Sequence, residues 1–457
     1  PRTTKPHNRC VGGFVVSQVL TTVDNQTLPL YIYPGLRGAI SPALGAVSAF
    51  FIAVVAIAFA LVLRLGKLER FLFRMTSAAI VGTGFMASVH AESLRRIGVT
   101  VLGVVGSSPA RAAEQAQSGG LPLPYKDFEE LLADERVDVV HVCSPNHLHR
   151  EHAIAALRAG KHVVCEKPLA MTTEEALELR DVARASGLVH AICFINRFYP
   201  HCQEARARVE SGAAGTVRLI TGSFLQDWLA KDTDWNWRLD PVLGGSLRAV
   251  GDIGSHWLDL AGFIGGRRVE AVMADLTTAI PTRLRPLDGP RATFAAAADG
   301  PTEPTTIDTE DIAGILIRFE GGARGVLTLS QVSPGRKARL SFELSGSEAS
   351  LHWSSETPEE LWIGHRDDAN QVLLRGGATS SARADAFNDY PAGHAQGYPD
   401  AFKALHRTVY AAVAAGGPPA APDYPTFDDG VEQALIADAV AQSARDGRWV
   451  SIDRSLA

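Results

Sequence analysis

Apolar runs and amphipathic stretches alternate along residues 76–194. Runs of strand length occupy 77–82, 100–105, 137–143, 162–165 and 189–194. Apolar residues with helical spacing lie between several of these runs. They occur in a stretch that ends at Ile97 and in three further segments, 128–133, 151–159 and 173–186. Strands joined through helices need crossover connections, so this order predicts an α/β region with a doubly wound parallel sheet.

The pattern changes after Arg197. Longer strand-like runs follow at 217–226, 269–279, 312–319, 324–332, 338–345 and 349–353, with turns such as 320–322. These runs predict a large, mostly antiparallel sheet, closed by two late helices at 399–415 and 428–446, whereas 281–306 and 376–397 are expected to be irregular. Because 457 residues exceed one hydrophobic core, we expect two domains, 76–196 and 197–457, with the last helices packing back toward the first.

The first 74 residues contain one long uncharged segment. No charge occurs from Gly38 to Leu63, which is long enough for the ~20 apolar residues of a membrane helix. We expect one transmembrane helix at about 40–63. The positive charges that follow it, against Arg37 alone before it, place the rest of the chain in the cytoplasm by the positive-inside rule.

Residues 27–33, 36–37 and 40–44 resemble the last periplasmic loop and final helix of an ABC transporter permease. The first methionine is Met75. Either a permease end is fused to a cytosolic protein, or two adjacent reading frames were joined and the natural protein begins at Met75. The second alternative is favoured, because a lone span has no partner helices.

Charge and cysteine content exclude some functions. The net charge is −6, with no block of like charge, so nucleic acid is not an expected partner. Five cysteines, without a C-x-x-C motif, fit reduced thiols better than a disulfide framework.

A glycine turn follows the first strand. Gly82, Gly84 and Ala87, with Phe85 and Met86 between them, match the turn whose backbone N–H groups approach a pyrophosphate at a helix N-terminus. The residue that meets the ribose should lie about 20 residues on.

The ribose position falls in Gly106-Ser107-Ser108-Pro109-Ala110-Arg111, which contains no acid. Arg111 is able to meet a 2'-phosphate, and Ser107 lies beside it. NADP is therefore favoured over NAD, although a helix-surface role for Arg111 is also open.

Three residues carry candidate chemistry. Lys167, in Glu166-Lys167-Pro168, stands where a strand ends, and strand ends face the ligand crevice of a parallel sheet. On a helix, Asp252 and His256 share a face, with Asp259 one step beyond. Imidazole suits removal of a hydroxyl proton as hydride leaves carbon. Asp252 is expected to orient His256, and Lys167 to stabilise the developing oxyanion.

Four motifs in order resemble the Gfo/Idh/MocA family, the glucose-fructose oxidoreductase and inositol dehydrogenase group. They are G-x-G-x-x-A at 82–87, SPNHLH at 144–149, AGKHVVCEKPLA at 159–170 and GD-x-G-x-H-x-x-D at 251–259. The resemblance implies a Rossmann domain, an open-faced α+β domain that often forms the oligomer interface, and NAD(P)-linked oxidation of a sugar or cyclitol hydroxyl. It also implies that Lys167, Asp252 and His256 are catalytic, with His256 the acid/base.

The neighbouring polar residues complete the predicted site. Ser144, Pro145, Asn146, His149 and Glu166 are expected to contact the cofactor. His147, His149 and His152 have metal-like spacing, but a turn leading into a helix explains them better, and no metal is expected.

Two further positions are candidate substrate contacts. Arg197 either lines the pocket or forms a salt bridge at a domain hinge. Trp237, with Trp228 and Trp235, suits either a sugar ring or core packing.

The sequence therefore predicts an NAD(P)-dependent oxidoreductase acting on a secondary hydroxyl of a sugar, cyclitol or polyol, assembled as a homo-oligomer through the open sheet. Two alternatives remain: a family member with tightly bound cofactor that acts by transient oxidation, and a membrane-tethered nucleotide-sensing or transporter-coupled subunit. The catalytic region is expected in the cytoplasm, membrane-anchored only if residues 38–63 are native.

Overall fold

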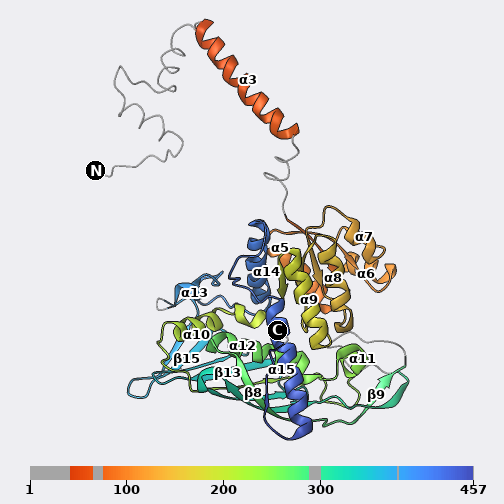
Figure 1. Ribbon diagram of the computed structural model, residues 1–457, viewed down its shortest axis with the longest axis vertical. Coiled ribbons are helices and arrows are strands. Elements are labelled where there is room, and N and C mark those ends of the chain that lie inside the picture. Colours follow the sequence, from red (N-terminus) through yellow and green to blue (C-terminus); the bar gives the residue numbers. More distant parts are fainter. Residues whose placement is uncertain (1–41, 65–75, 288–299, 378–379, 456–457) are drawn as a thin grey trace. The chain divides into compact units, whose positions relative to one another are not determined.

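The computed structural model describes residues 42–64, 76–287, 300–377 and 380–455. The chain separates into two compact units, Pro1–Arg74 and Met75–Ala457. The first unit contains one described helix, α3 (Pro42–Arg64), and the second contains all three described sheets (Figure 1).

Helix α3 corrects the expectation of a transmembrane segment. Its bounds are close to the predicted 40–63, but none of the helices built from described residues is long and apolar enough to cross a membrane. The permease resemblance lies outside the described residues except at the start of α3, and nothing in the structure supports it.

A six-stranded sheet forms the first half of Met75–Ala457, and all its neighbouring strands pair in parallel. The strand order β3-β2-β1-β4-β5-β6 is that of a Rossmann fold, as predicted. Its strands are β1 (Ser77–Val81), β2 (Thr100–Val105), β3 (Leu123–Pro124), β4 (Val139–Val142), β5 (His162–Cys165) and β6 (His190–Ile192). Its helices are α5 (Phe85–Arg96), α6 (Pro109–Gly119), α7 (Phe128–Ala133), α8 (His149–Arg158) and α9 (Thr173–Ser186).

Local sequence explains where these helices begin and end. The Thr172 side chain accepts a hydrogen bond from the backbone N–H of Glu175 at the start of α9, and Gly187 ends that helix with φ 66°. Side-chain capping and a left-handed glycine satisfy backbone groups that a helix leaves unpaired. The bounds of β2, β5, α7 and α9 agree with the sequence prediction.

A nine-stranded mixed sheet forms the second half, in the order β16-β15-β14-β13-β7-β12-β11-β8-β17. Only β7 and β12 pair in parallel. The strands are β7 (Leu219–Leu225), β8 (Val269–Thr277), β11 (Ile312–Phe319), β12 (Arg324–Ser330), β13 (Arg339–Ser345), β14 (Ser350–Ser354), β15 (Glu360–Gly364), β16 (Gln371–Leu374) and β17 (Val450–Ser451).

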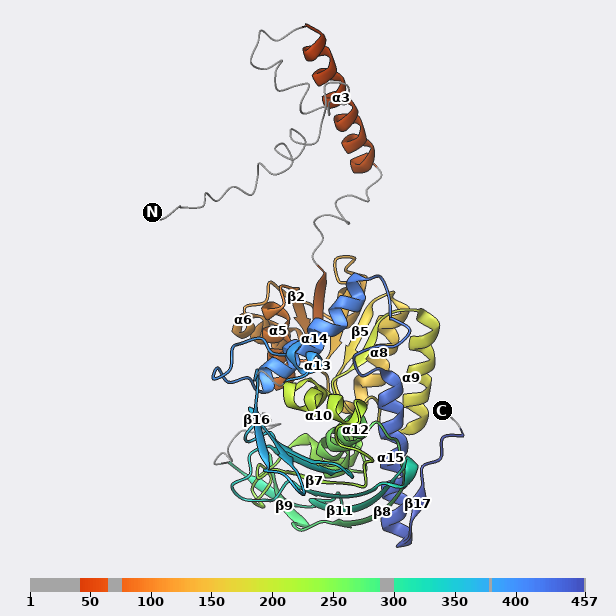
Figure 2. The same cartoon turned by 90° about the vertical axis from the view of Figure 1, so that its left-hand side faces the viewer.

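Burial alternates along β11 and β12, so one face of this sheet is covered and the other is exposed. Helices α10 (Pro200–Glu210) and α12 (Ser255–Gly265) lie on the covered face (Figure 2). The late helices α14 (Tyr398–Ala414) and α15 (Phe427–Asp446) pack against α5 and α9 respectively. The domain boundary at 196/197 stays a prediction.

The segment 281–306 corrects a second expectation. Instead of being irregular throughout, its described parts form an antiparallel pair of strands, β9 (Thr282–Pro286) and β10 (Thr302–Thr306). Arg283 in β9 is fully buried, because its guanidinium forms an ion pair with Asp311. In the other segment expected to be irregular, 376–397, the described residues contain only the short helix α13 (Ala382–Asp385).

Candidate active site

The glycine turn lies between β1 and α5. Gly82 has φ 119°, a conformation that favours glycine, and an added Cβ would lie 2.7 Å from the carbonyl carbon of Cys143. Gly84 is the N-cap of α5, and an added Cβ there would meet no atom within 4 Å. The turn therefore leaves open space in front of a helix N-terminus, where backbone N–H groups stabilise an anion.

Two loops at the carboxyl ends of β4 and β5 are joined by His149. One ring nitrogen lies 2.8 Å from the carbonyl oxygen of Ser144, and the other lies 2.6 Å from that of Pro168. Nearby, the Asn146 amide donates to the carbonyl oxygen of Gly244 at 3.0 Å. These contacts fix the two loops at the carboxyl edge of the parallel sheet, next to Lys167.

Lys167 contacts the second half of the molecule. Its Nζ donates to Asp252 Oδ1 at 2.7 Å and to the Asp252 carbonyl oxygen at 2.8 Å. Asp252 Oδ2 accepts from Gln331 Nε2 at 2.9 Å, and Arg238 Nε lies 3.3 Å from Oδ1. Burial alone raises the pKa of Asp252, but the charges of Lys167 and Arg238 hold that pKa well below its usual range.

Asp252 belongs to a π-helical turn, Val250–Gly254, which runs directly into α12. Such turns are rare in proteins, and those that occur often lie at functional sites. The carboxylate is directed to Lys167 and Gln331, whereas His256 Nδ1 is buried without a hydrogen-bond partner in the described structure. The expected orientation of His256 by Asp252 is therefore not what the geometry shows.

His256 is partly exposed and lines the same cavity as Lys167. Burial, followed by the positive charge of Lys167, lowers the pKa of His256 to about 3. The imidazole is consequently uncharged near neutral pH and has a lone pair with which to accept a proton.

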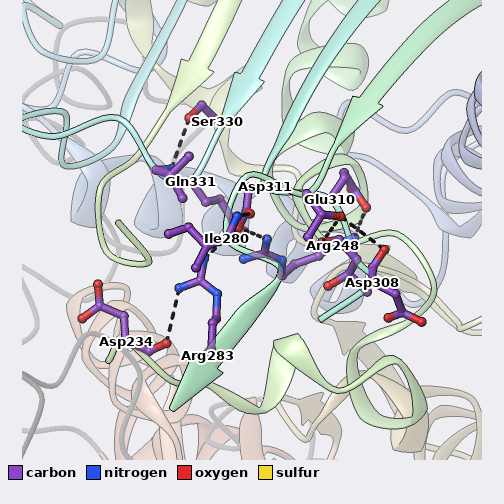
Figure 3. A network of polar contacts seen from close by, with 12 residues as sticks. Asp234, Arg248, Ile280, Arg283, Asp308, Glu310, Asp311, Ser330 and Gln331 are labelled. Carbon is purple, nitrogen blue, oxygen red and sulfur yellow. Dashed lines mark hydrogen bonds and ion pairs between the residues drawn. The ribbon is translucent and has the colours of Figure 1, made fainter. Parts of the chain in front are cut away.

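A buried polar network holds the start of this π-helical turn (Figure 3). The Glu310 carboxylate accepts from the backbone N–H groups of Arg248 at 3.1 Å and Val250 at 2.8 Å. Arg248 and Arg283 both form ion pairs with Asp311, and all three side chains are fully buried (Figure 3). The network fixes the backbone two residues before Asp252.

One cavity of about 1020 Å³ extends from the glycine turn to Lys167, Asp252 and His256. This volume is at the upper end of the range for ligand sites, as a dinucleotide with a small substrate requires. The predicted residues that line it are Gly82, Gly84, Phe85, Met86, Ser107, Ser144, Pro145, Asn146, His149, Glu166, Lys167, Trp237, Asp252 and His256.

Three predicted site residues do not line this cavity. Ala87 is buried behind the glycine turn. Arg111 is exposed and lies 3.6 Å from Glu114. Arg197 pairs with Asp259 and, at 2.6 Å, with Asp429, so the structure places it in a salt bridge between elements and not in the pocket.

The tryptophans differ in what they contact. Trp228 and Trp237 line the cavity, and the Arg238 guanidinium lies 4.4 Å from the Trp237 ring centroid. Trp235 and Trp228 both pack against a small apolar cluster that includes Leu229.

Sequence reasoning missed several cavity or support residues. Gln331 and Glu310 lie far from Asp252 in sequence, and Tyr398 lines the cavity from the first turn of α14. The adjacent acids Glu310 and Asp311, next to an apolar strand, were the available signal for the buried network. No local pattern distinguishes Tyr398.

Comparison with known proteins agrees with this arrangement. Residues 76–194 match the oxidoreductase family with an NAD-binding Rossmann fold, and residues 202–352 match the GFO/IDH/MocA C-terminal domain. Levoglucosan dehydrogenase of Pseudarthrobacter phenanthrenivorans is 32% identical over 389 residues, covering 82% of this chain and 98% of that protein. The chain belongs to the GFO/IDH/MocA oxidoreductase family.

Other members of the GFO/IDH/MocA family extend the comparison. D-glucoside 3-dehydrogenase of Escherichia coli is 34% identical over 254 residues, covering 55% of this chain and 68% of that protein. A structure of levoglucosan dehydrogenase in complex with NADH and levoglucosan has a TM-score of 0.73 and 30% identity, covering 83% of this chain and 99% of that one. This chain is therefore an oxidoreductase with an NAD-binding Rossmann domain. Neither family match covers residues 1–74, so the permease resemblance has no support there.

Proposed function

We propose that this protein oxidises a secondary hydroxyl group of a sugar, cyclitol or similar polyol, and catalyses the reverse reduction. The observation that carries the proposal is the contact between Lys167 and Asp252, made beside His256 in a cavity that also includes the glycine turn. When bound there, the nicotinamide ring of the dinucleotide supplies the hydride acceptor at C4.

His256 takes the hydroxyl proton as the substrate carbon loses hydride. Its imidazole is uncharged and so has a free lone pair for the proton, and its position on the cavity wall makes it accessible to a bound alcohol. Lys167 places a positive charge beside the same oxygen and stabilises the charge that develops on it.

Asp252 acts as the positioning residue for Lys167. Two contacts from Lys167 Nζ to one residue restrict the ammonium group to a small region. Gln331 holds the other oxygen of the Asp252 carboxylate, and Arg238 lies beside the oxygen that Lys167 contacts, so Lys167 is oriented by a fixed partner.

The substrate class rests on the polar and aromatic lining of the cavity. Trp228 and Trp237 offer ring faces, and Gln226 and Arg238 offer hydrogen-bonding groups. Such a combination suits a sugar ring, whose faces are apolar and whose edges are polar. The named relatives that act on levoglucosan and glucosides support the same class.

We also propose that NADP serves at least as well as NAD. An added Cβ at Gly106 would lie 2.7 Å from Thr83 Cγ2. Thr83 therefore leaves too little room for an acidic side chain at position 106, where such a side chain would meet the ribose. Arg111 is held only by an exposed ion pair with Glu114, which is weak and leaves the guanidinium able to turn toward a 2'-phosphate. A reducing, cytoplasmic setting fits the four described cysteines, all buried free thiols.

A substrate panel tests the proposal. The full chain is incubated with levoglucosan, glucosides, inositols and free hexoses, with NAD or NADP, and reduced nicotinamide is followed by absorbance. We expect turnover with at least one sugar and loss of turnover in Lys167→Met. No reduction of either cofactor by any member of the panel contradicts the proposed dehydrogenase activity.

A further inference from the structure

Three buried histidines meet behind the cofactor cavity. His90 comes from α5, His141 from β4 and His406 from α14, and all three are inaccessible to solvent. Their ring centroids are 5.1 Å apart for His90 and His141, 4.8 Å for His90 and His406, and 5.0 Å for His141 and His406. The ring planes are inclined at 65° to 90° to one another.

Each imidazole uses one nitrogen for an oxygen partner outside the cluster. These contacts are His90 Nε2 to Glu166 Oε1 at 3.1 Å, His141 Nε2 to the Tyr410 hydroxyl at 2.9 Å, and His406 Nδ1 to Ser93 Oγ at 2.5 Å. Of the other nitrogens, His90 Nδ1 and His141 Nδ1 face each other. One ligand atom from each histidine lies within 4.8 Å of the other two. Histidines that bind a metal show this arrangement, because the outer contact fixes the tautomer and the inner nitrogen holds the ion.

Hydrogen bonding within the cluster cannot satisfy all three rings. His90 Nδ1 and His141 Nδ1 lie 2.8 Å apart, so one donates to the other. His406 Nε2 is then left over, since it is buried and has no hydrogen-bond partner among the described residues. An unpaired buried nitrogen is unfavourable, and a metal ion between the rings removes this cost by accepting the lone pair of the nitrogen.

We propose that His90, His141 and His406 bind one Zn²⁺ ion, a site separate from the cofactor cavity. Three imidazole nitrogens at ~2.0–2.1 Å from a tetrahedral ion place the ring centroids about 5 Å apart, as in this cluster, and the nitrogens about 3.3 Å apart. His90 Nδ1 and His141 Nδ1, now 2.8 Å apart, therefore separate by about 0.5 Å to take the ion. A single water molecule completes the fourth position.

A second grouping, His90 with Glu166 and Cys193, is less suitable for a metal ion, because it needs the His90 nitrogen that is already bonded to Glu166.

The ion would connect three parts of the chain. His141 lies in β4, in the centre of the parallel sheet, and His90 lies in α5, the helix that follows the glycine turn. His406 lies near the middle of α14, far along the chain from both. Zinc therefore fixes α14 onto the Rossmann sheet. Through His90 it also fixes Glu166, the residue beside Lys167.

Metal analysis of the untagged full chain tests the site. Protein purified without chelators is expected to contain about one zinc per chain by inductively coupled plasma mass spectrometry. His406→Gln and His141→Gln should reduce zinc at least fivefold. His201→Gln is the matched control. His201 is buried like the three histidines and has an oxygen partner, the carbonyl of Glu359, but it lies outside the cluster. The His201→Gln variant should therefore retain zinc.

Two further measurements keep the test decisive if a variant folds poorly. Removal of zinc from the wild-type chain with a chelator should lower Tm, and added Zn²⁺ should restore it. Wild-type protein loaded with Co²⁺ should show visible absorption bands of a four-coordinate nitrogen site, which His406→Gln lacks. Folded wild-type protein that takes up no zinc after supplementation overturns the proposal, as does a His406→Gln variant with unchanged zinc content and Co²⁺ spectrum.

Discussion

Replacing Lys167 with methionine separates its effect on catalysis from its effect on stability. Methionine has a similar length and shape but no charge. The change removes both contacts of Nζ with Asp252, at 2.7 and 2.8 Å. The Asp252 carboxylate keeps the Gln331 amide at 2.9 Å and Arg238 at 3.3 Å, so it is not left without partners.

These contacts set the expected magnitudes. Because Asp252 retains partners, the loss of folding free energy should be about 1–3 kcal/mol and not the larger cost of an isolated buried charge. In a chain of this size, such a loss lowers Tm by only a few degrees. If Lys167 stabilises the developing oxyanion, its removal should lower kcat by about 10²–10³.

The pH dependence gives a second readout. Lys167 lowers the pKa of His256, so Lys167→Met should raise that pKa from about 3 toward its ordinary value. The acid limb of kcat/KM should therefore move to higher pH in the variant. A residue that only supports the fold would not move this limb.

Lys161→Met is the matched control. Lys161 is also buried, and its Nζ donates to the carbonyl oxygen of Asp134, away from the cavity. Both variants are assayed by nicotinamide absorbance with the best substrate of the panel, and their Tm values are compared. Full turnover in Lys167→Met, or an equal loss of kcat in Lys161→Met, would refute the assigned role.

Further outcomes are expected at four places in the molecule. Because the pKa of His256 is about 3, kcat/KM of the wild-type enzyme should fall less than twofold between pH 7.5 and 5.5, whereas a base of ordinary pKa predicts a nearly tenfold fall. The same lowered pKa means that the free energy of unfolding should decrease as pH falls below about 6.5, as measured by urea unfolding. Glu310→Gln removes one of two acceptors for backbone N–H groups and should cost about 1–3 kcal/mol in urea unfolding. Arg111→Ala should lower kcat/KM for NADP severalfold and leave that for NAD within twofold, in parallel initial-rate assays. Leu316→Arg, on the exposed face of β11, should reduce the oligomer size seen by light scattering if that face joins copies of the chain.

Sequence alone predicted the parallel sheet well because its strands and helices are defined by local patterns. The apolar strand ending at Cys165 and the helix capped by Thr172 and Gly187 are examples, since each carries its own start and stop signals. The placement of Lys167 at a strand end followed from the same reasoning.

The remaining features depend on contacts that no local pattern contains. The π-helical turn at Val250–Gly254 directs the Asp252 carboxylate to Lys167 and Gln331, although helical spacing had paired Asp252 with His256. The strand β9 looked irregular because its burial comes from the ion pair of Arg283 with Asp311, not from an apolar pattern. In both cases tertiary contacts override the local signal.

The Glu310 and Asp311 network explains why the site tolerates an unusual backbone. A π-helical turn is less favourable than an α-helix, so it persists where surrounding contacts fix it. Glu310 accepts hydrogen bonds from the backbone N–H groups of Arg248, before the turn, and of Val250, its first residue. Asp311 anchors the Arg248 side chain in the same segment (Figure 3). Asp252 is thereby held at a position from which it reaches Lys167 across the boundary between the two sheets. Catalytic geometry in this molecule consequently depends on a buried network in the second sheet as much as on the strand that ends at Lys167.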